Sequence, residues 1–219
     1  MEFKPDFVEL IARRRAALRA ELAVILPQPR PIILELGCGH GHFLERYARE
    51  FPSRFCLGVD LRSDRIARAR RKAHRAGHLN CHFIHAEARE FLLALPSGVT
   101  FVEIWVLFPD PWPKLRHHKN RLLQPEFFEA IANQARAGAP LYFRTDYGDY
   151  FREVENFLLS LLTWQPAPAA AWPLEHETVF QARAASYHSL VAIRTLHPAR
   201  PVETVAPGLP PPASPTSAA

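Results

Sequence analysis

The sequence predicts an α/β fold, in which a mostly parallel sheet is covered by helices on both faces. Between residues 31 and 196, short apolar segments rich in β-branched and aromatic residues alternate with helical patterns. Residues 177–196 hold no long helix between their apolar runs, so we expect a final antiparallel pair of strands. A chain of 219 residues, 48% hydrophobic and 22% charged, is long enough to bury one core.

The expected elements follow one another in pairs along the chain. Nearly continuous apolar runs indicate strands that are buried on both faces, and apolar residues at helical spacing indicate amphipathic helices between them. In chain order, the strands are expected at residues 32–36, 54–61, 81–85, 100–108 and 141–145. The helices that follow them are expected at residues 42–50, 63–76, 87–95, 125–137 and 149–162. Each strand, helix and next strand form a crossover unit, which makes the two strands parallel.

Composition divides the chain into three parts. Residues 1–30 are expected to form one helix and a proline-containing linker, and residues 31–196 carry the α/β pattern. Residues 197–219 are dense in proline and alanine and poor in large apolar side chains. Such a segment buries too little surface to offset the entropy of ordering it, so we expect a disordered tail.

The overall composition favours an anionic partner and a cytoplasmic setting. The formal net charge is +5, and arginine greatly outnumbers lysine, which is compatible with binding to nucleic acid. The three cysteines, Cys38, Cys56 and Cys81, form no CxxC pair of the kind used in metal or redox sites. We expect a cytoplasmic protein, because no run approaches about 18 apolar residues and the N-terminus lacks a signal-peptide pattern.

A glycine-rich turn follows the first expected strand, in the segment ILELGCGHGHF at 33–43. Gly37, Gly39 and Gly41 let the backbone turn tightly and approach a ligand closely. A dinucleotide site would carry its third glycine where this chain has His42. Glu35 would also place a negative charge beside a pyrophosphate. The turn therefore favours a cationic adenosine cofactor, such as S-adenosylmethionine.

Three acids are expected at the carboxyl ends of the first three strands. Glu35 suits a cationic group, Asp60 can accept hydrogen bonds from ribose hydroxyls, and Glu87 lies where an adenine would rest. Each also has an ordinary interpretation: Glu35 as a strand-end acid, Asp60 as a helix N-cap and Glu87 as a first-turn acid. Because open α/β sheets bind ligands at this edge, the three together favour a cofactor site.

The segment FPDPWPKLRHHKNR at 108–121 leaves the fourth strand. Its prolines make a stiff extended loop that would hold Asp110 at the mouth of the site, with Trp112 available to stack on a base. The basic and imidazole side chains that suit phosphates are Lys114, Arg116, His117, His118, Lys119 and Arg121. The alternative is a solvated loop with Trp112 in the core. The adjacent histidines have no third ligand at metal spacing, so we expect no metal.

The helix expected at 63–76 has an apolar stripe and a basic face. The packing stripe is formed by Ile66, Ala69, Ala73 and Ala76. The basic residues Arg62, Arg65, Arg68, Lys72 and Arg75 fall largely on another face. A solvated face is the default interpretation, and a contribution to RNA docking is the alternative.

Together these segments resemble the tRNA (guanine-N7-)-methyltransferase family. The resemblance covers residues 31–196 and rests on ELGCGHGHF, FPDPWPKLRHHKNR with the following RLLQPEFF, RTDYGDYF at 144–151 and TVFQAR at 178–183. It implies a class I methyltransferase fold with a seven-stranded sheet. It also implies S-adenosylmethionine as the cofactor, and methyl transfer to N7 of the variable-loop guanosine of tRNA. Monomer and homodimer both stay open.

The resemblance also implies roles for individual residues. The cofactor-binding residues would be Glu35, Gly37, Gly39, Gly41, Asp60, Glu87 and Asp110, with Asp110 also catalytic. The substrate-binding residues would be Lys114, Asp146, Thr178, Val179, Phe180 and Gln181. The family usually has glutamate at the last position. Gln181 offers one acceptor oxygen to the N–H donors of guanine, so recognition would be weaker or rely more on Asp146.

Two other functions stay open. The PDPW sequence loosely resembles the loop of methyltransferases that act on exocyclic amines, although Asp110 and the basic residues after it argue against such a substrate. A non-catalytic RNA-binding relative is the other alternative, with Gln181 as a sign of lost activity. The intact set of Glu35, Asp60, Asp110 and Asp146 argues against it.

Overall fold

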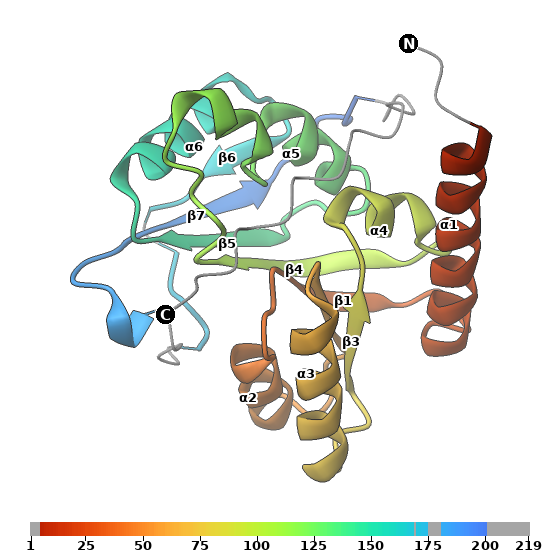
Figure 1. Cartoon of the computed structure of the whole chain (residues 1–219). Coiled ribbons are helices and arrows are strands. Elements are labelled where there is room, and N and C mark those ends of the chain that lie inside the picture. The colour runs from red at the N-terminus through yellow and green to blue at the C-terminus, as the bar shows by residue number, and fades with distance from the viewer. Residues whose placement is uncertain (1–4, 169, 175–180, 201–219) are drawn as a thin grey trace, which may run out of the picture.

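A seven-stranded sheet forms the centre of the computed structural model, which describes residues 5–168, 170–174 and 181–200 (Figure 1). The strands are β1 (Pro31–Leu36), β2 (Cys56–Asp60), β3 (Cys81–His85), β4 (Thr100–Leu107), β5 (Pro140–Thr145), β6 (Trp164–Pro166) and β7 (His188–Arg194). Their order is β3-β2-β1-β4-β5-β7-β6, and β7 pairs antiparallel with both β5 and β6. This order confirms the predicted seven-stranded, mostly parallel sheet.

The antiparallel end of the sheet uses a strand that the sequence does not reveal. β7 lies in the segment for which an antiparallel pair is expected, but β6 comes from residues 164–166, before that segment. A strand of three residues is too short to show a periodic pattern. It is held by Trp164, whose buried indole N–H donates to the Phe128 carbonyl at 3.0 Å.

Helices cover both faces of the sheet (Figure 1), and the sheet separates the buried core into two clusters. The helices are α1 (Pro5–Ile25), α2 (His42–Glu50), α3 (Ser63–Arg75), α4 (Ala88–Ala94), α5 (Pro125–Ala132), α6 (Gly148–Ser160) and the short 3₁₀ helices η1 (Leu115–Asn120) and η2 (Gln181–Arg183). Side chains alternate along β1, so Ile32 and Leu34 pack with α1, α4, α5 and α6, while Ile33 packs with α2 and α3.

Both ends of the described chain are attached to the domain. Leu18 and Leu22 of α1 are buried in the larger core, and Arg15 pairs with Glu90 of α4 at 2.5 Å. After β7, the backbone N–H of Arg200 donates to a Glu129 carboxylate oxygen at 3.0 Å. The described structure therefore reaches beyond residue 196, while most of the predicted tail, residues 201–219, lies outside it. Among the described helices, none has the length and apolarity needed to cross a membrane.

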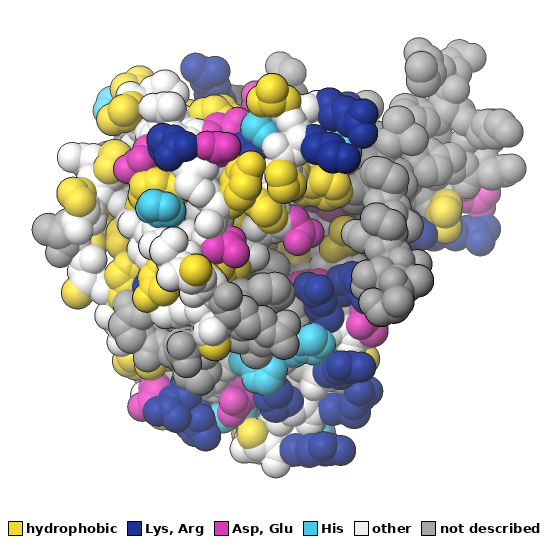
Figure 2. Space-filling model, turned by 60° about the vertical axis from the view of Figure 1, so that its left-hand side comes forward, with side chains coloured by type: hydrophobic (Ala, Val, Ile, Leu, Met, Phe, Trp, Pro, Cys, Tyr) yellow, Lys and Arg dark blue, Asp and Glu magenta, His cyan; other side chains and the backbone are white. Residues whose placement is uncertain are grey.

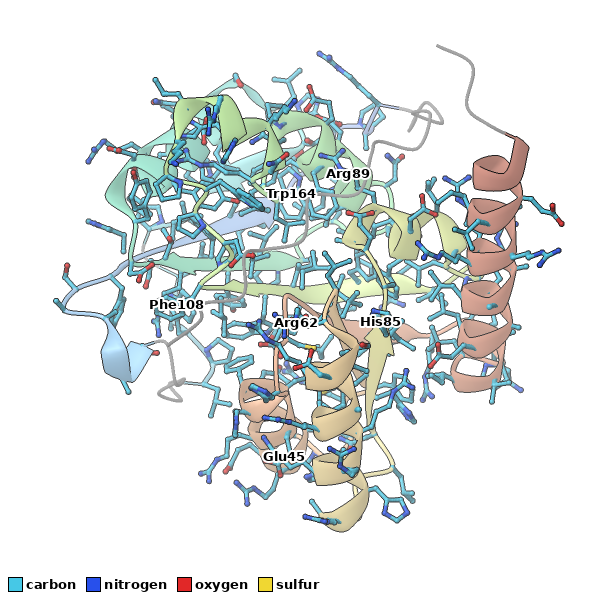
Figure 3. All side chains as sticks on the ribbon, in the orientation of Figure 1. Glu45, Arg62, His85, Arg89, Phe108 and Trp164 are labelled. Carbon is cyan, nitrogen blue, oxygen red and sulfur yellow. The ribbon has the colours of Figure 1, made fainter. Side chains whose placement is uncertain are left out.

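The parallel strands end along one edge of the sheet, and several of the predicted site residues lie at this edge or in the segments that leave it. Figure 3 labels Phe108, Arg62 and His85, which mark the ends of β4, β2 and β3. β4 and β5 are neighbours, and the backbone N–H of Phe108 donates to the Arg144 carbonyl at 2.8 Å. The loops that leave β4 and β5 therefore begin side by side.

Candidate active site

The glycine turn after β1 combines a structural glycine with two glycines that border open space. Gly37, Gly39 and Gly41 all have positive φ, at 77°, 53° and 68°. A Cβ at Gly41 would lie 2.5 Å from the Phe83 ring, so this glycine is required by packing. At Gly37 and Gly39 a Cβ would meet no atom of the described residues within 4 Å. These two glycines expose backbone to a ligand, as close approach requires.

Glu35 is a buried acid at the end of β1. In the sheet it is paired with Gly58 of β2 and Trp105 of β4, and its Oε2 atom has no hydrogen-bond partner among the described residues. Burial, and then the negative charge of Asp60, raise the pKa of Glu35 to about 8. A buried carboxylate oxygen without a partner is costly, and a cation or a hydrogen-bond donor would relieve that cost. The position therefore suits the cationic ligand that the sequence predicts.

Asp60 joins the end of β2 to the glycine turn. Its Oδ2 atom accepts a hydrogen bond from the Gly39 N–H at 2.8 Å, and its Oδ1 atom accepts one from the Arg62 N–H at 2.7 Å. The residue at the N-cap of α3 is Arg62, so the N-cap interpretation of Asp60 is wrong. The two backbone donors orient the buried carboxylate, whose remaining lone pairs can accept further hydrogen bonds.

Glu87 has the ordinary role that its position allows. It is the N-cap of α4, and its Oε2 atom accepts a hydrogen bond from the Glu90 N–H at 2.9 Å. A cap of this kind satisfies one of the open N–H groups at the start of a helix. The contact uses one carboxylate oxygen, so it is compatible with a second role toward a ligand at the end of β3.

Arg121 differs from the other basic side chains of the 108–121 loop, because it is buried. Its guanidinium is 1% exposed and pairs with Glu153 of α6 at 2.5 Å. Its Nε–H donates to the Pro111 carbonyl at 2.8 Å, and Nη2 lies 2.9 Å from Nε2 of His118. The prediction that Arg121 contacts phosphate is wrong. Because Glu153 lies far away in the sequence, only the tertiary structure shows that this arginine fixes the loop that carries Asp110.

The rest of the loop lies at the surface, at the rim of the candidate site. Asp110, Lys114 and Lys119 are exposed. Trp112 is half-buried and meets the His117 ring edge-on, with 5.8 Å between the ring centroids. It belongs to neither apolar core, so the alternative that places it in the core is wrong. Across the described part of the chain, no group of acids, histidines or cysteines could hold a metal.

The loop is held in a strained backbone conformation. Phe108 and Trp112 have φ values of 51° and 44°, in the left-handed region that side chains disfavour. Each such residue costs about 1–3 kcal/mol and persists only where its surroundings hold it. The contacts of Arg121 with Pro111 and Glu153 supply this restraint. The loop geometry therefore depends on a buried ion pair.

Replacing Arg121 with methionine is expected to destabilise the fold by about 3 kcal/mol, because Glu153 and the Pro111 carbonyl lose their partner. Urea unfolding measures this loss, and Lys119→Met, in the same loop but exposed, is the control. The salt dependence of tRNA binding tests the assignment a second way. A phosphate contact would contribute about 0.7–0.9 to the slope of log Kd against log salt. We expect no change in that slope, and a decrease would contradict the structural role.

Gln181, at the start of η2, is bonded to a buried arginine of β5. Its Oε1 atom accepts a hydrogen bond from Nη1 of Arg144 at 3.0 Å, and its Nε2–H donates to the Tyr187 hydroxyl at 3.1 Å. Arg144 also lies over the rings of Trp172 and Tyr187, at 4.0 and 4.7 Å from their centroids. Arg144 is not predicted from the sequence, where its one signal is an arginine within a largely apolar strand.

The remaining predicted substrate residues are only partly placed. Asp146 is exposed and directly follows β5. Thr178, Val179 and Phe180 lie outside the described residues. The structure thus brings Asp110 and Asp146 to the ends of the adjacent strands β4 and β5. Gln181 is hydrogen-bonded to Arg144, near the end of β5.

Comparison with known proteins identifies relatives along most of the chain. A family model described as "Putative methyltransferase" matches residues 29–190. A tRNA (guanine-N(7)-)-methyltransferase of Thermus thermophilus is 35% identical over 144 residues, which are 64% of this chain and 46% of that protein. The protein of the same name from Treponema pallidum is 32% identical over 170 residues, which are 76% of this chain and 68% of that protein.

Solved structures show the same fold. The antibiotic-resistance methyltransferase Kmr superimposes with a TM-score of 0.54 at 20% identity, over 81% of this chain and 92% of that chain. The matched region spans about half to two thirds of the length of the first curated relatives. The family model nevertheless covers well over half of this chain, and it includes the glycine turn, the acids at the strand ends and the FPDPWPK loop. The chain belongs to the tRNA (guanine-N7-)-methyltransferase family.

Proposed function

We propose that this chain binds S-adenosylmethionine at the carboxyl edge of the sheet and transfers its methyl group to N7 of the variable-loop guanosine of tRNA. The observation that carries the proposal is the buried carboxylate of Glu35 at the end of β1, with an oxygen that has no partner among the described residues. A cationic adenosine cofactor supplies the charge that this carboxylate lacks, whereas a pyrophosphate would be repelled. The names of the relatives support the choice of tRNA. A tRNA substrate places the reaction in the cytoplasm.

The acids at the strand ends fit such a cofactor. Glu35 would face its cationic part, while Asp60, held by two backbone donors, would accept hydrogen bonds from the ribose hydroxyls. Glu87, which caps α4 with one oxygen, would lie toward the adenine. The open sides of Gly37 and Gly39 leave room for close contact. When bound, the cofactor supplies a methyl group on a positively charged sulfur.

Methyl transfer to N7 asks the protein for positioning more than for proton transfer. N7 carries a free lone pair and no proton, so no general base is required. The main contribution is alignment, which can supply several kcal/mol. Asp110 and Asp146 leave adjacent strands, where their carboxylates can orient the base and stabilise the positive charge that moves onto the purine. Both acids are thus electrostatic and positioning groups.

A substitution at Gln181 tests how this chain recognises guanine. Its carbonyl oxygen is already bonded to Arg144, so its NH₂ group points toward the Tyr187 hydroxyl. Gln181→Glu would add charge assistance to the Arg144 contact and a second acceptor for the N–H donors of guanine. We expect kcat/KM for tRNA to rise by about fivefold or more, since a hydrogen bond to a charged group is worth about 1 kcal/mol more than one to a neutral group.

The matched control for Gln181→Glu is Gln165→Glu, which adds the same charge at an exposed position on β6. Steady-state kinetics on an unmodified tRNA transcript compare the three proteins. A lower kcat/KM in Gln181→Glu, with Gln165→Glu unchanged, would show that the glutamine itself is part of substrate recognition.

The proposed function is tested by methyl transfer from labelled S-adenosylmethionine to unmodified tRNA, followed by aniline cleavage, which cuts the chain at N7-methylguanosine. We expect one cut, in the variable loop. Label incorporation without cleavage would mean that another atom is methylated. No incorporation, with cofactor binding retained in calorimetry, would favour the non-catalytic alternative.

A further inference from the structure

The outer face of α3 carries a row of cations, of which only Lys72 makes a hydrogen bond to another part of the described chain. Arg68, Arg71, Lys72 and Arg75, here called the α3 cationic stripe, lie three and four residues apart and so occupy one side of the helix. Figure 2 shows dark blue Lys and Arg side chains gathered in the lower part of this face. Like charges at this spacing destabilise a helix, so internal stability gives no reason for the stripe.

Nearby acids do not neutralise the stripe. Asp64 pairs with Arg62 at 3.1 Å, Glu45 lies 2.9 Å from His78, and Glu21 pairs with Arg70. Within the described residues, the side chains of the three arginines of the stripe have no hydrogen-bond or ion-pair partner. The positive charge of the stripe is therefore left for an external partner.

The surface over the stripe is hollowed. One hollow of about 510 Å³ is lined by Arg68, Arg71, Lys72, Arg75 and Ala76. A second, of about 350 Å³, is lined by Arg68, Lys72, His40 and His42, and so extends to the glycine turn. Burial, and the charges of Arg68, Arg65 and Lys72, lower the pKa of His40, as expected for a site of positive potential. The two hollows share Arg68 and Lys72 and adjoin each other.

Lys72 links the stripe to the glycine turn after β1. Its ammonium group donates to the His40 carbonyl at 3.0 Å and lies 2.7 Å from Nδ1 of His42. An anionic chain lying along the stripe would therefore reach the glycine turn at the edge of the candidate site. A series of cations in a continuous hollow matches a polyanion with regularly spaced charges, such as a phosphodiester backbone.

We propose that the α3 cationic stripe is a docking surface for the RNA phosphate backbone, on which the substrate is held while its target base enters the active site. This inference rests on the proposed function and adds to it the surface that binds the body of the RNA. It replaces the default interpretation of a merely solvated face. Phosphate contacts of this kind position an RNA without reading its sequence.

The test uses the full chain with Arg68→Gln, Arg71→Gln and Arg75→Gln combined, since glutamine keeps good helix propensity. Lys72 is left unchanged because it contacts the glycine turn. The control combines Arg14→Gln, Arg19→Gln and Arg49→Gln, which remove the same charge from exposed positions on α1 and α2. Fluorescence anisotropy measures binding of a labelled, unmodified tRNA transcript at several salt concentrations.

We expect the stripe variant to bind tRNA about tenfold or more weakly at low salt, with the slope of log Kd against log salt smaller by about 2. The control should change both far less. The affinity for S-adenosylmethionine, measured by calorimetry, and kcat at saturating tRNA should stay unchanged. Equal shifts in stripe variant and control would overturn the inference.

Two further outcomes separate the alternatives. Weaker binding of the stripe variant to phosphatidylglycerol vesicles or to polyglutamate, with unchanged tRNA affinity, would assign the stripe to a membrane or an acidic protein and overturn the inference. The wild-type chain reports on the proposed function independently. If it methylates tRNA while the two triple variants bind alike, only the docking surface is wrong; if it methylates no tRNA, the proposed function itself fails.

Discussion

Replacing Asp110 with alanine is expected to lower kcat for methyl transfer to tRNA about a hundredfold or more, with little effect on the unfolding free energy. Asp110 is exposed at the rim of the site, in a loop that Arg121 and Glu153 hold in place without it. Removing a preorganised group that stabilises charge in the transition state typically costs about 10²–10³ in kcat. Single-turnover methyl transfer measures the effect on the chemical step itself.

Asp149→Ala is the matched control, because Asp149 is another exposed acid near the end of β5 and pairs only with Arg152 among the described residues. Asp146→Ala should also lower turnover while cofactor binding stays nearly intact. If either variant at 110 or 146 lost cofactor affinity and turnover in equal measure, its carboxylate would belong to cofactor binding alone. Asn at position 110, which keeps shape and loses charge, separates electrostatics from packing.

Replacing Glu35 with glutamine is expected to have opposite effects on cofactor binding and stability. On the proposed function the substitution removes a charge that would face the cofactor, and loss of one partner of a buried charge pair costs about 2–5 kcal/mol. Affinity for S-adenosylmethionine should therefore fall by about thirtyfold or more, as calorimetry measures. Without cofactor, however, the variant should be more stable than the wild type at neutral pH, because the unfolded wild-type chain gains free energy by ionising Glu35, whereas an amide ionises in neither state.

The pH dependence of this stability difference gives a signed test. The pKa of Glu35 is raised from 4.5 to about 8 in the folded chain. Its contribution is therefore fully present below about pH 4.5 and is lost as the pH rises to 8. Relative to the wild type, Glu35→Gln should gain on the order of 3 kcal/mol of unfolding free energy between about pH 5 and pH 8. A difference that stays constant across this range would show that Glu35 is not held neutral.

Glu21→Gln is a suitable control for the pH series, since Glu21 is a partly exposed acid on α1 that pairs with Arg70.

The raised pKa of Glu35 also predicts that a proton is released when the cofactor binds. Below pH 8, binding of a cation should drive Glu35 to ionise, so affinity should rise from about pH 6 to pH 8 in the wild type. Glu35→Gln should lack this rise, and an equal rise in both proteins would assign it to another group.

The local features of the site were predictable because they depend on residues close in the sequence. A run such as IILEL followed by three glycines indicates a strand and a ligand turn by itself, and the acids Glu35, Asp60 and Glu87 follow directly from where strands end. Parallel strands share one carboxyl edge, so their end residues must converge. The structure confirms the order of these elements, and it also shows that Glu87 caps a helix.

The features that could not be predicted from the sequence are contacts between distant segments. Arg121 looks like a surface cation because lysines and histidines surround it, yet it is buried against Glu153 of α6. β6 is held by a contact between Trp164 and Phe128 that no periodic pattern predicts. Gln181 is held by Arg144 of β5, and an arginine within an apolar strand does not by itself reveal this partner. Such pairs are set by packing across the fold, which a single sequence does not record.

The sequence by itself therefore determined the fold class, the glycine turn, the acids at the strand ends and the position of the FPDPWPK loop, because hydrophobic period and loop chemistry are local properties. The tertiary structure alone decided which charges are buried and which are available. It made Arg121 a support of the FPDPWPK loop, left one oxygen of Glu35 without a partner among the described residues, and left the three arginines of the α3 cationic stripe without an ion pair there. Burial decides the role of a charge, because an ion in the interior must find a partner while an ion at the surface is free to attract one.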